Sequence, residues 1–131
     1  KNKTVLPNAS YEMPSNLDVF YAIKNDDFDS FRLCFATKDG VNLSNSNAEN
    51  YSPFTYAVMM GNTEMVKFFL NHMADASALD KRGLNAFHTA AQNHNMAICK
   101  MLLNEDPSLK DSLTKNGKTA TQVSAESTFT I

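Results

Sequence analysis

The chain has 131 residues, of which 43% are hydrophobic and 20% are charged, and its formal net charge is −2. This length suits one globular domain or one short repeat array, and the charge gives no electrostatic basis for binding nucleic acid or an anionic membrane. No signal peptide is recognisable, and no apolar run approaches the roughly 20 residues of a transmembrane helix. The chain starts at Lys1 without a methionine, so we expect an excised part of a longer protein whose targeting signals are missing.

The two cysteines, Cys34 and Cys99, are too few for a disulfide framework and lack zinc-ligand spacing. We interpret them as reduced thiols of an intracellular, cytoplasmic protein. Both fall at apolar positions of predicted helices, where a cysteine packs as a small hydrophobe. A catalytic thiol needs a base within hydrogen-bond reach, and the spacing suggests none.

Residues 1–15 contain two prolines and no sustained hydrophobic period, which predicts an extended lead-in or linker. Residues 16–131 are periodic. The similar stretches "SPFTYAV", "NAFHTAA" and "TATQVSA" start at residues 52, 85 and 119, spacings of 33 and 34 residues. A fixed period of about 20 to 50 residues indicates a solenoid. We expect one array with units at about 16–46, 47–79 and 80–113 and a partial unit at 114–131.

Each complete unit predicts a turn followed by two antiparallel helices. The expected helices are 17–24 and 28–36, then 53–59 and 63–71, then 86–92 and 96–104, with a last helix from about 120. Ser52, Asn62, Asn85 and Asn95 are the expected caps, and Thr119 with Gln122 has the spacing of a capping box. Apolar residues cover a broad face of each second helix, so these helices are expected to be buried between neighbours. They are Phe31, Leu33, Cys34 and Phe35; Met65, Val66, Phe68, Phe69 and Leu70; and Ile98, Cys99, Met101, Leu102 and Leu103.

The stretches "NAENYSPFTYAVMMGNTEMVKFFLNHMADAS" and "DKRGLNAFHTAAQNHNMAICKMLLNEDPSLK" resemble the ankyrin repeat. Its pattern runs D-x-x-G-x-T-P-L-H-x-A-A, a glycine break and an apolar second helix. The resemblance covers roughly 115 residues and implies an all-α ankyrin-repeat solenoid of about three repeats plus a partial C-terminal repeat. The departures from the pattern are expected to weaken local turns and to keep the register. Thr55 and Gln122 replace the usual histidine, His94 replaces the glycine break, and Met73 and Asp106 replace a later glycine.

His88 could be a catalytic base, a metal ligand or a structural group. The resemblance implies a structural bridge between the turns of adjacent repeats. No nucleophile or carboxylate shares its predicted face, which argues against a hydrolase that uses Cys99 with His88. The three histidines share no helical face, so no zinc site is expected.

Asp26, Asp27 and Asp29 could form an acid–base or calcium cluster. They also lie at a predicted helix start, where carboxylates cap N–H groups, and they lack the EF-hand pattern. We prefer the capping interpretation. The sequence therefore predicts no catalytic residue, no metal and no cofactor, and a chain that is not itself an enzyme.

The resemblance implies a partner-binding surface on the concave side of the array, formed by turn tips and the ends of first helices. Carried over residue by residue, this surface comprises Glu49, Tyr51, Met59, Met60, Leu79, Lys81, Arg82, Leu84, Gln92 and Asn93. Several are apolar where the core does not need them, as at partner sites. The methionines could instead pack on the lead-in or on flanking sequence. Arg32, Lys67 and Lys100 would form a stripe along the outer helices, which is usually a solvated face.

These features predict a monomeric protein–protein interaction module, an adaptor or scaffold that binds a protein partner and neither nucleic acid nor membrane. The alternative is a substrate-recruiting or regulatory domain of a larger enzyme, or a secreted bacterial effector that acts in the host cytoplasm.

Overall fold

The computed structural model describes residues 18–36, 46–72 and 74–129, with side chains up to residue 124. These ranges contain α-helices and no β-strand. The α-helices are α1 (Val19–Lys24), α2 (Phe28–Ala36), α3 (Pro53–Met59), α4 (Thr63–Asn71), α5 (Ala86–Gln92), α6 (Met96–Glu105) and α7 (Ala120–Phe129), and η2 (Pro107–Asp111) is a 3₁₀ helix. The predicted helices are confirmed to within two residues at each end. The predicted lead-in, residues 1–15, lies outside the described residues.

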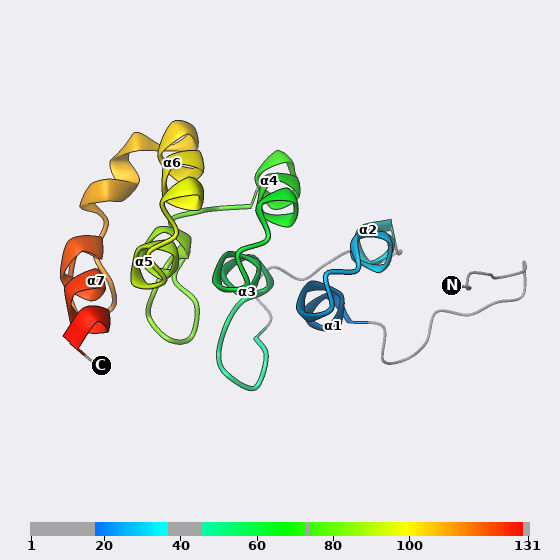
Figure 1. Cartoon of the computed structure of the whole chain (residues 1–131), viewed down its shortest axis with the longest axis horizontal. Helices are drawn as coiled ribbons and strands as arrows, with labels where there is room; N and C mark the ends of the chain where they lie inside the picture. The colour runs from blue at the N-terminus through cyan, green and yellow to red at the C-terminus, as the bar shows by residue number, and fades with distance from the viewer. Residues whose placement is uncertain (1–17, 37–45, 73, 130–131) are drawn as a thin grey trace, which may run out of the picture.

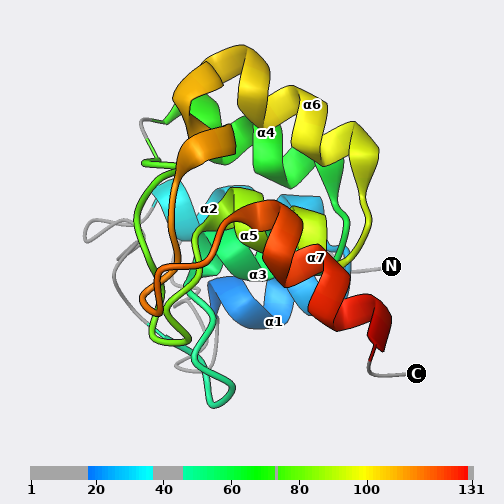
Figure 2. The same cartoon turned by 90° about the vertical axis from the view of Figure 1, so that its left-hand side faces the viewer.

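The helices form two parallel rows. In Figure 1, α1, α3, α5 and α7 follow one another in the lower row, and α2, α4 and α6 lie above them. Each second helix packs on the first helix of its own pair, and each first helix packs on the next first helix. Figure 2 looks along the array with α7 nearest the viewer. The described part of the chain is thus the helical solenoid that the period predicted, and none of its helices has the length and apolar composition to cross a bilayer.

Each helix begins where a polar side chain satisfies backbone donors of the first turn. The Ser52 hydroxyl accepts a hydrogen bond from the Thr55 amide at 3.1 Å, and Pro53 occupies the first position of α3, where no amide proton is needed. Equivalent bonds run to the side-chain oxygens of Asn62, Asn85 and Asn95 at 3.0, 2.8 and 3.1 Å. The caps predicted from the sequence are confirmed.

The residue that breaks each helix pair has a positive φ angle. The values are 55° at Asp26, 74° at Gly61 and 57° at His94. Glycine adopts this region without steric cost, while aspartate and histidine are among the other residues found there. The same connector geometry is therefore built with one glycine and two side-chain-bearing residues, so the replacement at His94 leaves the turn in place.

An aromatic cluster joins α2 to α4. The Phe31 ring is fully buried and lies 5.3 Å from both Phe68 and Phe69, measured between ring centroids. Edge-to-face pairs of this kind add roughly 0.5–1.5 kcal/mol each beyond area burial. The expectation that Leu33 is buried was wrong, because its side chain is 49% exposed. Among the described residues α2 is the first helix of its row, so no helix before it covers that side.

The two thiols belong to the core. Cys34 on α2 and Cys99 on α6 are both buried, and burial raises the pKa of both thiols. A raised pKa disfavours the reactive thiolate. The structure therefore supports the interpretation of both residues as small hydrophobes.

The segment after α6 differs from the expectation. Asp106 stands where the repeat pattern has a glycine, yet its φ angle is −151°, an extended conformation. Its carboxylate accepts a hydrogen bond from the Ser108 amide at 3.1 Å and so starts η2, which the sequence did not predict. Leu109 of η2 is 1% exposed and belongs to the core, so η2 closes the outer side of the third helix pair.

Candidate partner-binding face

The turns before α3, α5 and α7 share one hydrogen-bond pattern. In each, the side-chain oxygen of the first residue accepts bonds from the amides two and four residues later. The acceptors are Asn47, Asp80 and Thr114, and the six distances lie between 3.0 and 3.3 Å. The fourth residues, Asn50, Gly83 and Gly117, have φ angles of 71°, 85° and 78°. This repeated shape fixes where the tip residues lie.

Neighbouring turns are also joined to each other. The Lys115 amide donates to the Gly83 carbonyl at 2.9 Å. The approach is so close that a Cβ atom at Gly83 would lie 2.7 Å from the Cβ of Lys115. Glycine is therefore required at residue 83 both for its φ angle and for the space.

His88 is the structural bridge that the resemblance implied. The ring is 0% exposed. Its Nδ1 atom accepts a hydrogen bond from the Asn85 amide at 3.1 Å, so the proton resides on Nε2, which donates to the Ser112 carbonyl at 3.0 Å. Burial lowers the pKa of His88, and the bond to Ser112 offsets part of this shift. The neutral ring therefore joins α5 to the chain that enters the next turn.

The two residues that replace this histidine keep its local bond. The Thr55 hydroxyl accepts from the Ser52 amide at 2.9 Å, and the Gln122 side-chain oxygen accepts from the Thr119 amide at 2.8 Å. Thr55 also donates to the Asp80 carboxylate at 2.7 Å. It therefore links its repeat to the next one, as His88 does.

The remaining histidines lie apart from His88. The His72 ring contacts the Phe68 carbonyl at 2.8 Å, and the His94 ring lies 3.4 Å from the Ser124 hydroxyl. Across the described residues, no group of three histidine, cysteine, aspartate or glutamate side chains is placed to hold a metal ion.

Tyr51 and Arg82, both predicted to bind the partner, lie in contact. The Arg82 guanidinium carbon is 3.9 Å from the Tyr51 ring centroid. One guanidinium nitrogen lies 2.7 Å from the Asp80 carboxylate and 2.7 Å from the Thr89 hydroxyl. The ion-paired side chains of Arg82 and Asp80 are only 16% and 1% exposed. Arg82 is thus fixed within the array, where it holds Tyr51 in place.

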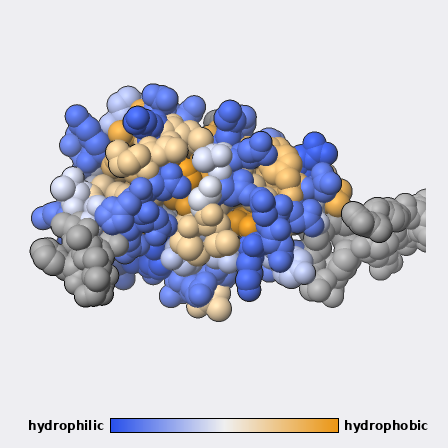
Figure 3. All heavy atoms as spheres, viewed as in Figure 1, coloured by the Kyte–Doolittle hydropathy of each residue, from blue (hydrophilic) through white to orange (hydrophobic). Residues whose placement is uncertain are grey.

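The other predicted binding residues differ in exposure. Met60 and Leu79 are 42% and 47% exposed. Glu49, Lys81 and Asn93 are exposed, while Met59, Leu84 and Gln92 are half-buried. In the view of Figure 3, apolar side chains form several groups along the array, with hydrophilic side chains between and around them. We call the ten predicted residues together the predicted binding face.

Some exposed residues were not predicted. Tyr21, Met96 and Leu113 are 63%, 64% and 53% exposed. Tyr21 shares a repeat position with Tyr56 and Thr89, which are buried, so the repeat register alone places it in the core. Its exposure follows from its location on α1, the first helix of its row among the described residues.

The acidic group after α1 has two roles. The Asp27 carboxylate accepts from the Ser30 amide at 3.2 Å, which is the predicted cap of α2. Asp26 instead accepts from the Asn62 side-chain amide at 2.6 Å and so joins two connectors. No feature of the sequence near Asp26 indicated that second bond.

Comparison with known proteins agrees with this architecture. A family model described as ankyrin repeats matches residues 19–111 in three copies. Diacylglycerol kinase iota of Homo sapiens is 34% identical over an alignment of 98 residues, which covers 70% of this chain and 9% of that protein. Diacylglycerol kinase iota of Rattus norvegicus is 35% identical over an alignment of 95 residues, which again covers 70% of this chain and 9% of that protein. The chain spans about 9% of the length of these relatives.

Proposed function

Because the chain belongs to the ankyrin repeat family, we propose that it binds a protein partner on the predicted binding face and serves as an adaptor or scaffold. Ankyrin repeats are protein-interaction modules and are generally not catalytic. The observation that carries the proposal is the exposure of Met60 and Leu79, two apolar members of the predicted binding face, to which the Tyr51–Arg82 pair also belongs. Methionine, tyrosine and arginine are residue types that are enriched at interface centres.

The exposed apolar side chains can contribute a measurable part of the free energy of binding. Complete burial of a methionine or leucine contributes about 1.5–3 kcal/mol. About half of each side chain remains exposed here, so a partner would gain about 1 kcal/mol from each. Arg82 already holds the Tyr51 ring, which lowers the entropy that the ring loses on binding.

The test compares two double variants with the same purified partner, identified beforehand by crosslinking to the wild-type chain in native extract. Met60→Ala with Leu79→Ala removes apolar area from the predicted binding face. Lys67→Ala with Lys100→Ala changes exposed positions on the outer helices and is the control. Calorimetry should show roughly tenfold or greater weakening for the first pair and little change for the second. The opposite result would assign the binding site to the outer basic stripe.

A second candidate is a regulatory or recruiting part of a larger enzyme. The observation that favours it is that the chain matches only 9% of the length of relatives named as kinases. On this proposal, residues 19–129 influence an activity that resides elsewhere in the same polypeptide. The full open reading frame tests it directly: a catalytic domain encoded with these repeats supports this candidate, and its absence supports the independent adaptor.

We also propose that the chain is monomeric and cytoplasmic and binds neither nucleic acid nor membranes. The net charge of −2 and the two buried thiols support this. Light scattering, cell fractionation, and binding assays with duplex DNA and anionic vesicles test the four parts separately.

A further inference from the structure

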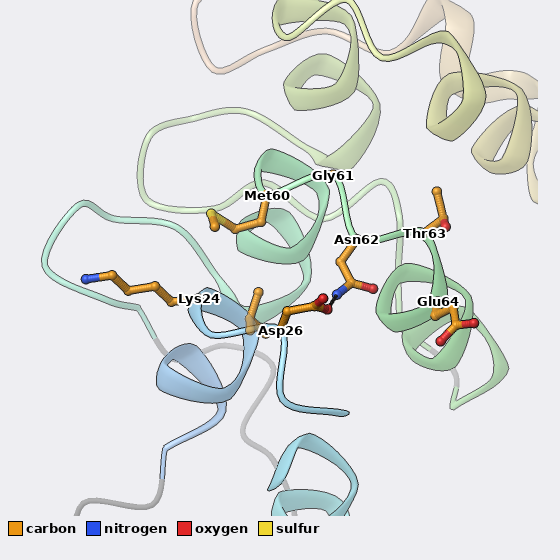
Figure 4. A pocket seen from close by; sticks show the side chains of 8 residues that line it. Lys24, Asp26, Met60, Gly61, Asn62, Thr63 and Glu64 are labelled. Carbon is orange, nitrogen blue, oxygen red and sulfur yellow. Dashed lines mark hydrogen bonds between the residues drawn. The ribbon is translucent and has the colours of Figure 1, made fainter. Parts of the chain in front are cut away.

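A pocket of about 450 Å³ opens between the first two helix pairs. It lies beside the connectors that follow α1 and α3, as Figure 4 shows. The end of α1 and the connector after it contribute Ile23, Lys24 and Asp26. The connector after α3 and the start of α4 contribute Met60, Gly61, Asn62, Thr63 and Glu64. Of these, only Met60 belongs to the predicted binding face, so the pocket extends that face towards the first repeat.

The pocket combines apolar and acidic lining groups. Met60 is 42% exposed and supplies the accessible apolar surface of the pocket, whereas Ile23 is 1% exposed and belongs to the core behind it. The Asp26 carboxylate accepts a hydrogen bond from the Asn62 side-chain amide at 2.6 Å. This bond between the two connectors fixes the orientation of the carboxylate. Figure 4 shows this bond and places the Glu64 carboxylate on the other side of Asn62.

Within residues 18–36, 46–72 and 74–129, no cation is paired with the carboxylates of the pocket. The ion pair found among the described residues joins Arg82 to Asp80, and neither Asp26 nor Glu64 takes part in one. Lys24 also lines the pocket, but Figure 4 shows its ammonium group directed away from the Asp26 carboxylate. The pocket therefore offers negatively charged acceptors together with the exposed Met60 side chain.

We propose that this pocket receives an arginine side chain of the protein partner, an inference that rests on the proposed function. An arginine has an aliphatic stem that can cover the exposed Met60 side chain while its charged head stays near solvent. Its guanidinium presents several donors in a plane and is more weakly hydrated than an ammonium group. Charge-assisted bonds to a carboxylate are stronger than neutral ones. An anionic side chain fits less well because Asp26 and Glu64 would repel it. A wholly apolar side chain would remove water from both carboxylates without replacing its hydrogen bonds.

The test uses Nα-acetyl-arginine N-methylamide as the probe and needs no partner. The probe is titrated into the ¹⁵N-labelled chain, and amide chemical shifts are followed by NMR. The neutral isostere Nα-acetyl-citrulline N-methylamide is the control ligand. We expect saturable shifts at residues 23–26 and 60–64 with the arginine probe and none with the citrulline compound.

Charge-removing variants then locate the effect. Asp26→Asn with Glu64→Gln preserves shape, and asparagine tolerates the positive φ angle of residue 26. The arginine probe should bind this variant roughly fivefold or more weakly. Glu105→Gln at the exposed end of α6 is the matched control and should leave binding unchanged.

Equal shifts with the citrulline compound, shifts located elsewhere, or unchanged binding in the double variant would each overturn the proposal. These results are separable from the test of partner binding. If Met60→Ala with Leu79→Ala abolishes partner binding but the arginine probe does not bind the pocket, the predicted binding face is retained. The same result rejects the pocket as an arginine site.

Discussion

The ring of His88 accepts a hydrogen bond from Asn85 at one nitrogen and donates to Ser112 from the other. Only the neutral ring satisfies both partners, because a protonated Nδ1 would face another donor. Burial lowers the pKa of His88 from its ordinary value of 6.5. The contribution of the ring to stability is thus fully present above pH 6.5 and is lost as the pH falls through the lower pKa of the folded state.

We therefore expect the free energy of unfolding to decrease between pH 7.5 and pH 5, by at most about 1.4 kcal/mol per pH unit between the two pKa values. His88→Gln is the control, because Gln122 already makes the equivalent cap in the last helix. Urea denaturation at several pH values measures both proteins. Equal pH dependence in the two proteins would show that His88 is not the group that titrates.

Gly83 and Gly117 occupy the same place in neighbouring turns, with φ angles of 85° and 78°. A Cβ atom at Gly117 would meet nothing within 4 Å, whereas one at Gly83 would lie 2.7 Å from the Lys115 Cβ. Both Gly→Ala substitutions should cost about 1–2 kcal/mol from the φ angle. Gly83→Ala should cost a further ~1 kcal/mol or more from overpacking. Denaturant midpoints compare the two variants, and equal losses would contradict the close approach of the turns.

Elements are tied together by the Asp80 carboxylate, which receives bonds from Thr55 of the preceding repeat and from Arg82. Asp80→Asn should preserve the turn, because Asn47 accepts the same two backbone bonds one repeat earlier. It should remove the acceptor for Thr55 and leave Arg82 without its ion pair. We expect a loss of about 2 kcal/mol, measured by urea denaturation.

A double-mutant cycle between Thr55→Val and Asp80→Asn isolates the link between the repeats. A coupling energy near zero would show that the 2.7 Å contact does not hold the repeats together. A coupling on the order of 0.5–3 kcal/mol is typical of residues in direct contact.

The helices were predictable from the sequence because their starting signals are local. Ser52, Asn62, Asn85 and Asn95 cap within three residues, and the period places each helix in the array. The burial of Leu33 was misjudged because burial depends on which repeats are adjacent, and a repeat register treats all units as equal. The 3₁₀ helix η2 was missed because proline after a helix predicts only that the helix ends.

The candidate site was predictable in part. The register indicates which residues lie at turn tips and helix ends, such as Tyr51 and Met60. It does not indicate side-chain partners between repeats, which is why the engagement of Arg82 by Asp80 and Thr89 was unforeseen. The sequence around Asp26 indicates only a capping role, because its bond to Asn62 depends on two connectors that are 36 residues apart.

At the scale of the whole molecule, stability in an array comes from each repeat and its contacts with neighbours. Phe69 is fully buried, and its ring lies within 5.4 Å of Phe31, Phe35 and Phe54. Phe69→Ala should therefore cost about 3–5 kcal/mol. Because at least three repeats are needed for stability, helical circular dichroism should be lost in one transition at lower urea concentration. The exposed Leu33→Ala is the control and should change the midpoint little. A Phe69→Ala protein that loses only half of its helical signal would show that the pairs fold independently.

The bond from the Lys115 amide to the Gly83 carbonyl makes this amide a local probe of the contact between the last two turns. The amide is protected from solvent exchange only while the last turn remains attached to the turn before it. Its exchange rate with deuterium therefore reports the free energy of detaching the C-terminal repeat, separately from global unfolding. A partner that contacts both turns would slow this exchange by a factor set by its affinity and concentration. The NMR signal of the Lys115 amide would then report partner binding at the C-terminal end of the array.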